Sequence, residues 1–190
     1  MIDKKPFQEL RKTLETFDKK REELIALSRS VLKKSKAAIY SAQRQDMKEA
    51  NALLIEACTQ TGKLHELAKK DHQLLQTGAY HEALEEYAEA ACFVHYLLHE
   101  TIPTAKQLNV PAEIYLQALS DLVGELVRKA INSAAKSDYK TTIQIKKFVE
   151  ELYGELMLFD FRNSPARRKF DAIKYGLEKL EDIALKIALK

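Results

Sequence analysis

Two acidic residues, Glu86 and Glu89, stand where a predicted helix becomes apolar on almost every side, from Tyr87 onward. A helix that is apolar all round lies at the centre of a fold. A carboxylate that enters such an interior must be neutralised, paired with a cation or bound to a metal ion, because an isolated buried charge is costly. These two glutamates are therefore candidates for chemistry.

A second acidic pair, Asp121 and Glu125, lies four residues apart on one face of the next long predicted helix. Gly124 lies between them and costs a helix about 1 kcal/mol relative to alanine, so we expect a backbone or a ligand to approach closely there. If the two helices are neighbours, all four carboxylates converge. Oxygen ligands without histidine or thiolate suit Mg²⁺ or Mn²⁺ and not zinc. Such a cation stabilises charge in phosphoryl transfer and activates water, which is nuclease chemistry.

The same acids also have a structural interpretation, in which they form ion pairs with Arg29, Arg128 or Lys129. Spacing alone leaves both interpretations open. Three arginines are candidate nucleic-acid contacts: Arg21 lies within an apolar seam, Arg29 belongs to a basic cluster, and Arg128 follows the second acidic pair by one turn. Planar guanidinium groups suit phosphate oxygens. A charge cluster is also common on a solvated face, so this point stays open too.

Other catalytic motifs are missing from the sequence. His95 and His99 have the spacing of a zinc-protease pair, but no glutamate follows the first histidine. We expect His95 to be a core residue with a satisfied hydrogen bond. No Glu-x-x-His occurs, which counts against a di-iron bundle. No glycine-rich phosphate loop occurs, which counts against a nucleotide-binding motor.

The composition is that of one globular helical domain. The 190 residues include 31 Lys or Arg and 28 Asp or Glu, and 46% are apolar, which excludes a disordered chain. Only 5 Gly and 4 Pro argue against a sandwich, barrel or propeller. A net charge of +3 is too small to indicate a nucleic-acid partner by itself. Neither a membrane span nor a secretory signal is visible, so we expect a cytoplasmic protein with Cys58 and Cys92 as buried thiols.

Apolar residues at spacings of three and four predict an all-α fold, a single-domain bundle of six to seven helices over residues 1–190. We expect helices at about residues 7–42, 47–76, 80–100, 112–135, 141–159 and 165–187. The long first and last helices suit packing between subunits.

Several residues mark the predicted helix ends. Asp46 and Glu49 have capping-box spacing before the second helix, and Gly78 is expected to close that helix. Ser164 and Pro165 form a strong start signal for the last helix.

The apolar seam of the first helix is interrupted by polar residues one heptad apart, namely Arg21, Ser28 and Ser35. Two interpretations are open. The helix either faces something other than a uniform apolar surface, or it carries a polar layer that sets the packing register.

Separate blocks of the sequence, in the right order, resemble the translin family, and more closely its branch of translin-associated factor X (TRAX). The resemblance covers nearly the whole chain. Its anchors are Asp18 to Arg29 (DKKREELIALSR), Glu86 to Ala90 (EYAEA) with His95, Tyr115-Leu116, Asp121 to Leu126 (DLVGEL), Ile131 to Ser133 (INS), and the tail from Phe161-Arg162-Asn163 to Leu177-Glu178-Lys179.

The resemblance implies an all-α, translin-like fold that assembles into a closed octameric shell and binds single-stranded DNA and RNA. In the TRAX branch it also implies Mg²⁺-dependent endoribonuclease activity, with catalytic acids at Glu86, Glu89 and Asp121 and with Glu125 close by. Translin has no acidic pair at the positions of Glu86 and Glu89. Because this chain has both glutamates, it resembles the catalytic branch. We expect a homo-oligomer in place of a mixed translin–TRAX complex.

Three hypotheses follow. The first is a Mg²⁺-dependent endoribonuclease acting on single-stranded or imperfectly paired RNA, with Glu86, Glu89, Asp121 and Glu125 at the metal. The second is a noncatalytic shell that binds single-stranded DNA or RNA, in which the acids form internal ion pairs. The third is a helical scaffold without a nucleic-acid role.

Overall fold

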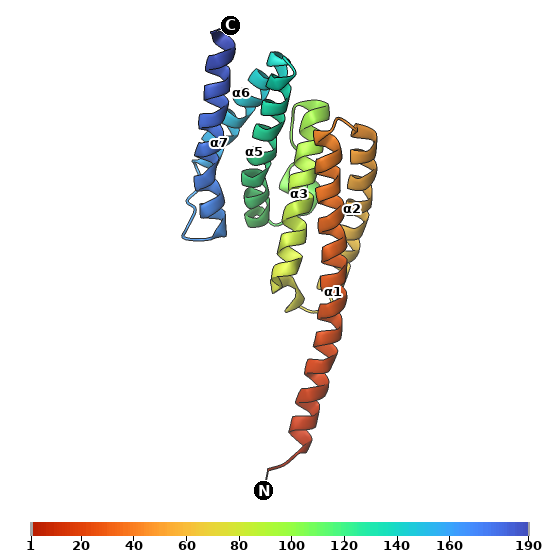
Figure 1. Ribbon diagram of the computed structural model, residues 1–190. Helices are drawn as coiled ribbons and strands as arrows, with labels where there is room; N and C mark the ends of the chain where they lie inside the picture. The colour runs from red at the N-terminus through yellow and green to blue at the C-terminus, as the bar shows by residue number, and fades with distance from the viewer. Residues whose placement is uncertain (1, 190) are drawn as a thin grey trace.

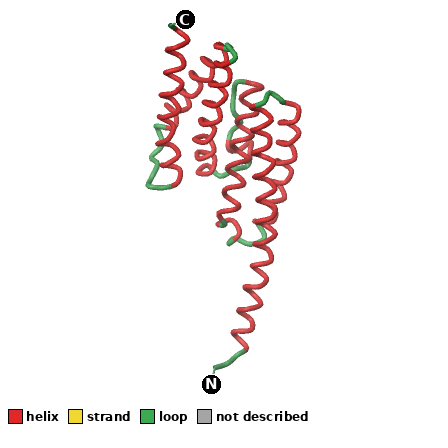
Figure 2. The backbone as a smooth tube through the Cα atoms, viewed as in Figure 1, coloured by secondary structure: helices red, strands yellow, loops and turns green. Residues whose placement is uncertain are grey.

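The computed structural model describes residues 2–189, and every regular element within them is helical (Figures 1 and 2). The all-α fold expected from the apolar spacing is confirmed. The elements are α1 (Lys5–Gln43), α2 (Met47–Ala68), the 3₁₀ helix η1 (Leu74–Gln76), α3 (Gly78–His99), α4 (Ala105–Leu108), α5 (Ala112–Ala135), α6 (Tyr139–Leu156) and α7 (Pro165–Ala188).

Helix α3 lies at the centre of the bundle, as its apolar circumference predicts. Helices α1 and α2 pack on one side of it and α5 packs on the other, while α6 and α7 cover α5 (Figure 1). Ala90 and Phe93 of α3 belong to a core cluster shared with α5, whereas Ala83 and Leu84 belong to a second cluster shared with α1 and α2. The two cores therefore meet at α3, which fixes the helices on either side of it.

Side-chain caps begin two helices where the sequence predicts them. Asp46 accepts a hydrogen bond from the Glu49 amide at 3.1 Å at the start of α2. Ser164 accepts one from the Arg167 amide at 3.4 Å at the start of α7, and Pro165 is the first residue of that helix. Each bond satisfies an amide that has no partner within its own helix.

The second predicted helix is shorter than expected. It ends at Ala68, and a turn and η1 connect it to α3. Asp71 in this turn lies 3.3 Å from Lys20 Nζ, which ties the turn to α1. Gly78 does not close α2 but is the first residue of α3, because the backbone of Thr77 is extended (φ −72°, ψ 131°). The other predicted boundaries agree within three residues, except that the loop after α3 contains the short helix α4.

The polar seam of α1 divides into two parts. Ser28 and Ser35 are buried, and neither hydroxyl has a hydrogen-bond partner among the described residues. Small side chains at these positions let α1 approach α2 and α3, on which it packs. Arg21 is 45% exposed and lies 3.7 Å from Glu22, so it does not continue the buried layer.

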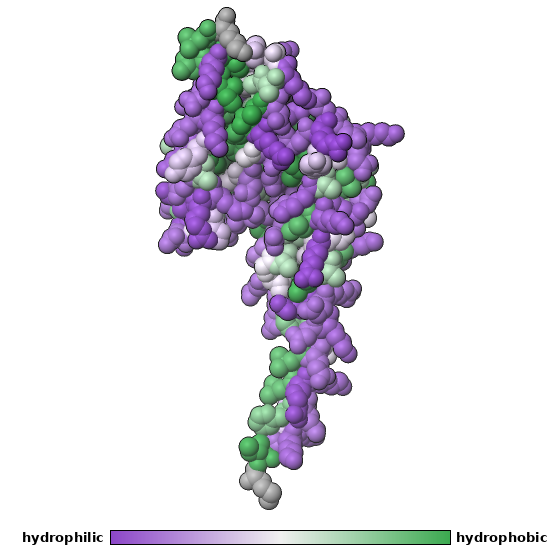
Figure 3. Space-filling view, viewed as in Figure 1, coloured by the Kyte–Doolittle hydropathy of each residue, from purple (hydrophilic) through white to green (hydrophobic). Residues whose placement is uncertain are grey.

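The first turns of α1 project beyond the rest of the bundle (Figure 1). Their apolar side chains have no neighbour to cover them: Phe7, Leu10 and Leu14 are 53%, 60% and 62% exposed. Figure 3 shows these apolar side chains along the projecting segment. A row of exposed apolar residues at helical spacing is typical of an interface.

Two expectations about single residues need correction. Cys58 is exposed and only Cys92 is buried. His95 is half-buried, although its Nδ1 does have the expected partner, the Thr101 carbonyl at 2.8 Å. No helix within residues 2–189 is long and apolar enough to cross a membrane.

His65 predicts how the stability of the bundle depends on pH. It is buried, with Nδ1 2.8 Å from the Tyr80 hydroxyl, and burial together with the charge of Lys69 lowers its pKa below the ordinary 6.5. The unfolded chain therefore binds this proton at a higher pH than the folded protein, so the free energy of unfolding falls as pH drops below about 6.5. We expect His65→Gln to flatten the decrease between about pH 7 and pH 5 in urea titrations. An equal slope in the two proteins would contradict this assignment.

Candidate functional site

One cavity of about 960 Å³ opens between α1, α3, α5 and α7, and all four predicted carboxylates line it. Glu86 and Glu89 come from α3, while Asp121 and Glu125 come from α5, which packs directly on α3. The two acidic helices are therefore neighbours, as convergence of the acids requires. In Figure 1, α1 and α7 lie on either side of α3 and α5, and residues of all four helices line the cavity.

Gly124 lines this cavity, and the close backbone approach expected there does not occur. A Cβ at this position would meet no atom within 4 Å. The close approach occurs instead at Gly176 of α7, where a Cβ would lie 3.1 Å from Val127 and 3.4 Å from Val123 of α5. Gly176 thus brings α7 against α5, and with it the basic residues of α7.

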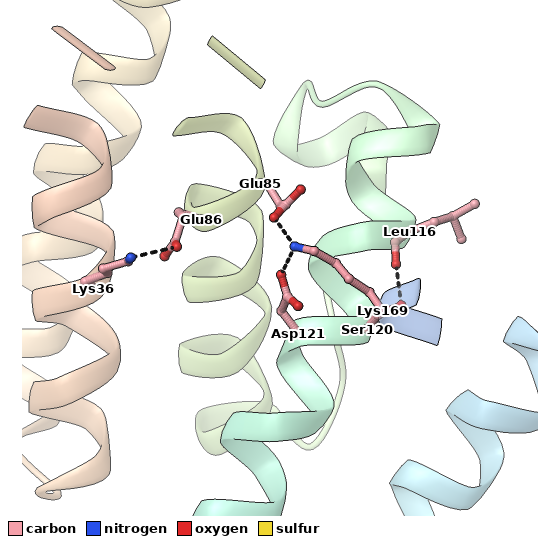
Figure 4. A network of polar contacts seen from close by, with 7 residues as sticks. All are labelled: Lys36, Glu85, Glu86, Leu116, Ser120, Asp121 and Lys169. Atoms are coloured by element: carbon pink, nitrogen blue, oxygen red, sulfur yellow. Dashed lines mark hydrogen bonds and ion pairs between the residues drawn. The ribbon is translucent and has the colours of Figure 1, made fainter. Parts of the chain in front are cut away.

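Glu86 of α3 forms an ion pair with a lysine of α1. Lys36 Nζ of α1 lies 3.0 Å from a carboxylate oxygen of Glu86 (Figure 4). The hydrogen bond and the charge of Glu86 raise the pKa of Lys36 above its usual range. Lys36 therefore stays charged at the mouth of the site, where its side chain is 57% exposed.

Asp121 shares a lysine with a glutamate that the sequence analysis did not select. Lys169 Nζ of α7 lies 2.5 Å from Asp121, and it also pairs with Glu85 of α3 (Figure 4). Burial opposes the charge of Lys169, but the two carboxylates outweigh it and raise the pKa of the lysine. The sequence spacing does not predict these contacts, because Lys169 is far from Glu85 and Asp121 along the chain. The only sequence signal is that Glu85 is adjacent to Glu86.

A glutamine holds Glu125. Gln43 Nε2, at the end of α1, donates to a carboxylate oxygen of Glu125 at 2.8 Å and to its backbone carbonyl at 2.9 Å. Arg128 Nη1 lies 3.7 Å from the same carboxylate. The Glu125 carboxylate is therefore oriented by the neutral amide of Gln43 and is only loosely paired with Arg128.

Glu89 is the exception among the four acids. It is 8% exposed, and its carboxylate has no hydrogen bond or ion pair with any residue in the described range 2–189. Burial raises its pKa to about 8, and the charges of Glu86, Asp121 and Glu125 add to the effect, against a smaller opposing effect of Lys169. With this pKa, Glu89 keeps its proton at neutral pH and becomes an uncompensated buried charge only as pH rises through about 8, unless a cation binds beside it.

The predicted basic residues are only partly brought to this site. Arg128 lines the cavity, whereas Arg21 and Arg29 lie on parts of α1 outside it. The structural interpretation named Arg29, Arg128 and Lys129 as partners of the acids. Arg128 does pair with Glu125, whereas Glu86 and Asp121 pair with Lys36 and Lys169. Two further cations line the cavity from α7, Arg168 and Lys179.

The donor set suits a hard divalent cation by its chemistry, since every candidate ligand is a carboxylate. In the described chain, no three carboxylate, imidazole or thiolate groups lie close enough together to hold one ion as the side chains stand. Glu86 and Asp121 each turn toward a lysine. For a metal ion to bind in this cavity, Glu86 must therefore release Lys36 and Asp121 must release Lys169.

Comparison with known proteins identifies the family. The model of the translin family matches residues 19–190. The chain belongs to the translin family. It is 30% identical to Translin of Gallus gallus in an alignment of 121 positions that covers 56% of this chain and 53% of that protein. The chain thus spans about half the length of the translins that it matches. It is 26% identical to Translin-associated protein X of Rattus norvegicus, over 95% of this chain and 77% of that protein.

Solved structures share the whole fold. Apo-NeC3PO superimposes with a TM-score of 0.88 at 26% identity, and the match covers 97% of each chain. AfC3PO in a duplex RNA complex superimposes with a TM-score of 0.84 at 26% identity, again over 97% of each chain. The resemblance to translin and TRAX that the sequence blocks indicate is therefore confirmed. The roles assigned to the individual site residues stay predictions.

Glu89 makes the metal-free protein sensitive to high pH. Its pKa rises from an ordinary 4.5 to about 8 on folding, so the folded protein retains a proton that the unfolded chain has lost. This stabilisation is fully present below about pH 4.5 and is lost as pH rises through about 8. In EDTA at about pH 9, Glu89→Gln should therefore have a Tm several degrees above wild type, since about 1 kcal/mol shifts Tm by about 2–4 °C in a chain of this size.

The matched control is Glu82→Gln, an exposed glutamate on the same helix. It should leave the Tm unchanged at about pH 9 in scanning fluorimetry. Equal melting of Glu89→Gln and wild type at about pH 9 would refute the uncompensated charge at Glu89.

Proposed function

We propose that this protein is a Mg²⁺-dependent endoribonuclease that cleaves single-stranded or imperfectly paired RNA in the cavity between α3 and α5. The observation that carries the proposal is Glu89, a buried carboxylate without a cation partner and with three further carboxylates lining the same cavity. A structural cluster of acids would pair each charge internally. This cluster leaves its most buried member without a cation partner, so Glu89 is held protonated until a cation compensates its charge.

Glu86, Glu89 and Asp121 would hold the metal ion, with Glu125 as an additional or indirect ligand. A bound divalent cation neutralises charge on the phosphoryl group and lowers the pKa of bound water. Mn²⁺ is expected to replace Mg²⁺, because both favour oxygen ligands. Gln43 keeps Glu125 oriented toward the cavity. Glu89 must lose its proton for the site to form, so activity should increase with pH toward about 8.

Positive side chains around the acids would bind the RNA backbone. Arg128, Arg168 and Lys179 line the cavity, and Lys36 and Lys169 become available to phosphates when the carboxylates turn to the ion. Arg21 and Arg29 stay candidates for contacts farther along α1. The translin family of the chain and the duplex RNA in the AfC3PO complex support nucleic-acid binding.

The proposal includes assembly into a closed homo-oligomeric shell, an octamer by family resemblance. The projecting segment of α1 supports assembly, because its exposed Phe7, Leu10 and Leu14 need a partner surface. A second copy of the chain is the partner that the resemblance implies.

The alternative is a noncatalytic shell that binds single-stranded DNA or RNA. The lysine pairs of Glu86 and Asp121 favour it, because they already satisfy two of the four acids.

Cleavage of labelled single-stranded RNA decides between these functions. With Mg²⁺, wild type should cleave the RNA, whereas Glu89→Gln, Glu86→Ala and Asp121→Ala should fall to the level seen in EDTA because the cation is no longer held. All three variants should retain RNA binding and oligomer size, and the exposed Glu82→Gln should cleave normally. A wild-type protein that binds RNA with strong salt dependence but never cleaves it would favour the noncatalytic shell.

Assembly is tested at the projecting helix. Leu10→Glu combined with Leu14→Glu places charge in the exposed apolar row, so light scattering after gel filtration should show a smaller assembly. The control, Gln8→Glu combined with Thr13→Glu, adds the same charge at exposed polar positions of the same segment. An unchanged mass for the leucine variant would exclude this row from the interface.

A further inference from the structure

Two exposed tyrosines line the carboxylate cavity. Tyr40 of α1 is 54% exposed and Tyr175 of α7 is 57% exposed. Neither hydroxyl has a hydrogen bond to another residue of the described chain. By contrast, Tyr80, Tyr87 and Tyr96 are each only 5% exposed and contribute to the core.

A cation lies against each exposed ring. The guanidinium carbon of Arg44 is 5.6 Å from the ring centroid of Tyr40. The Nζ of Lys174 is 4.9 Å from the ring centroid of Tyr175. An aromatic ring beside a positive charge offers a base a surface for stacking and its phosphate a counter-charge.

The two rings flank the carboxylates. Helix α1 packs on α3 and helix α7 packs on α5, so the tyrosines come from opposite walls of the cavity (Figure 1). Tyr40 is one helical turn after Lys36, the partner of Glu86. Tyr175 follows Lys169, the partner of Asp121, by about 9 Å along the helix axis. Each ring therefore belongs to a helix that already contacts one acid.

We propose that Tyr40 and Tyr175 stack on unpaired bases on either side of the phosphate that enters the carboxylate cluster, an inference that rests on the proposed function. Stacking on an aromatic side chain requires a base that has left its own stack. A paired duplex keeps its bases inside the helix and reaches only the cations. The two tyrosines thus select single strands, without preference for a base type, because every base has an aromatic face.

The experiment measures binding of a short RNA that contains 2-aminopurine, in EDTA and at about 150 mM salt, so that cleavage plays no part. The same strand is tested alone and annealed to its complement. Wild type should bind the single strand and quench its fluorescence by stacking. Tyr40→Leu and Tyr175→Leu should each weaken single-strand binding about tenfold and reduce the quenching. Binding of the duplex should change less than about twofold, because the phosphate contacts remain.

The phenylalanine variants are the matched controls. Tyr40→Phe and Tyr175→Phe keep the ring, so they should bind and quench like wild type. The slope of binding against salt should be the same in all variants, since Arg44 and Lys174 are unchanged. Leucine variants that bind the single strand like wild type, or that weaken both forms of RNA equally, would overturn the stacking inference.

The nuclease proposal fails separately. A wild-type protein that shows these binding differences but does not cleave RNA with Mg²⁺ would refute the nuclease and support the stacking sites. A wild-type protein that cleaves RNA with Mg²⁺, in the absence of these binding differences, would support the nuclease and refute the stacking sites.

Discussion

The burial of Glu89 between α3 and α5 is the constraint on which the rest of the site depends. A carboxylate that is 8% exposed beside three others cannot ionise cheaply, so its pKa rises to about 8. The surrounding helices supply the compensation that is present. Lys36 comes from α1 and Lys169 from α7, and each neutralises an acid next to Glu89 without reaching Glu89 itself. Once Glu89 loses its proton, its charge has no cation partner among the described residues, which gives the cavity its chemical character.

The lysines make this arrangement exchangeable. An ammonium group is a compact charge on a flexible stem, whereas an arginine would hold a carboxylate in a fixed bidentate geometry. In the proposed function, Lys36 and Lys169 would release Glu86 and Asp121 to a cation and turn to a phosphate. The ion pairs and the proposed metal site are in this sense two states of the same residues.

The architecture divides its tasks among the helices. Helices α3 and α5 supply the acids because they are packed at the centre, where a carboxylate is partly withdrawn from water. Helices α1 and α7 lie outside them and keep exposed faces, so they supply the cations and the two tyrosines at the mouth. The projecting end of α1 then remains available for assembly.

The amino-acid sequence by itself determined the features that follow from local periodicity. Apolar spacing set the all-α fold and most helix boundaries, and acids at helical spacing in an apolar context identified two candidate pairs, Glu86 with Glu89 and Asp121 with Glu125. Only the packing of α3 on α5 brings the two pairs to one cavity. The tertiary structure alone decided which cations pair with them, because Lys36 and Lys169 reach the acids across helices that are distant in sequence. It also decided that α2 ends at Ala68, where the turn at Asp71 pairs with α1. Helical periodicity reports which face a side chain occupies, but not which neighbour that face meets.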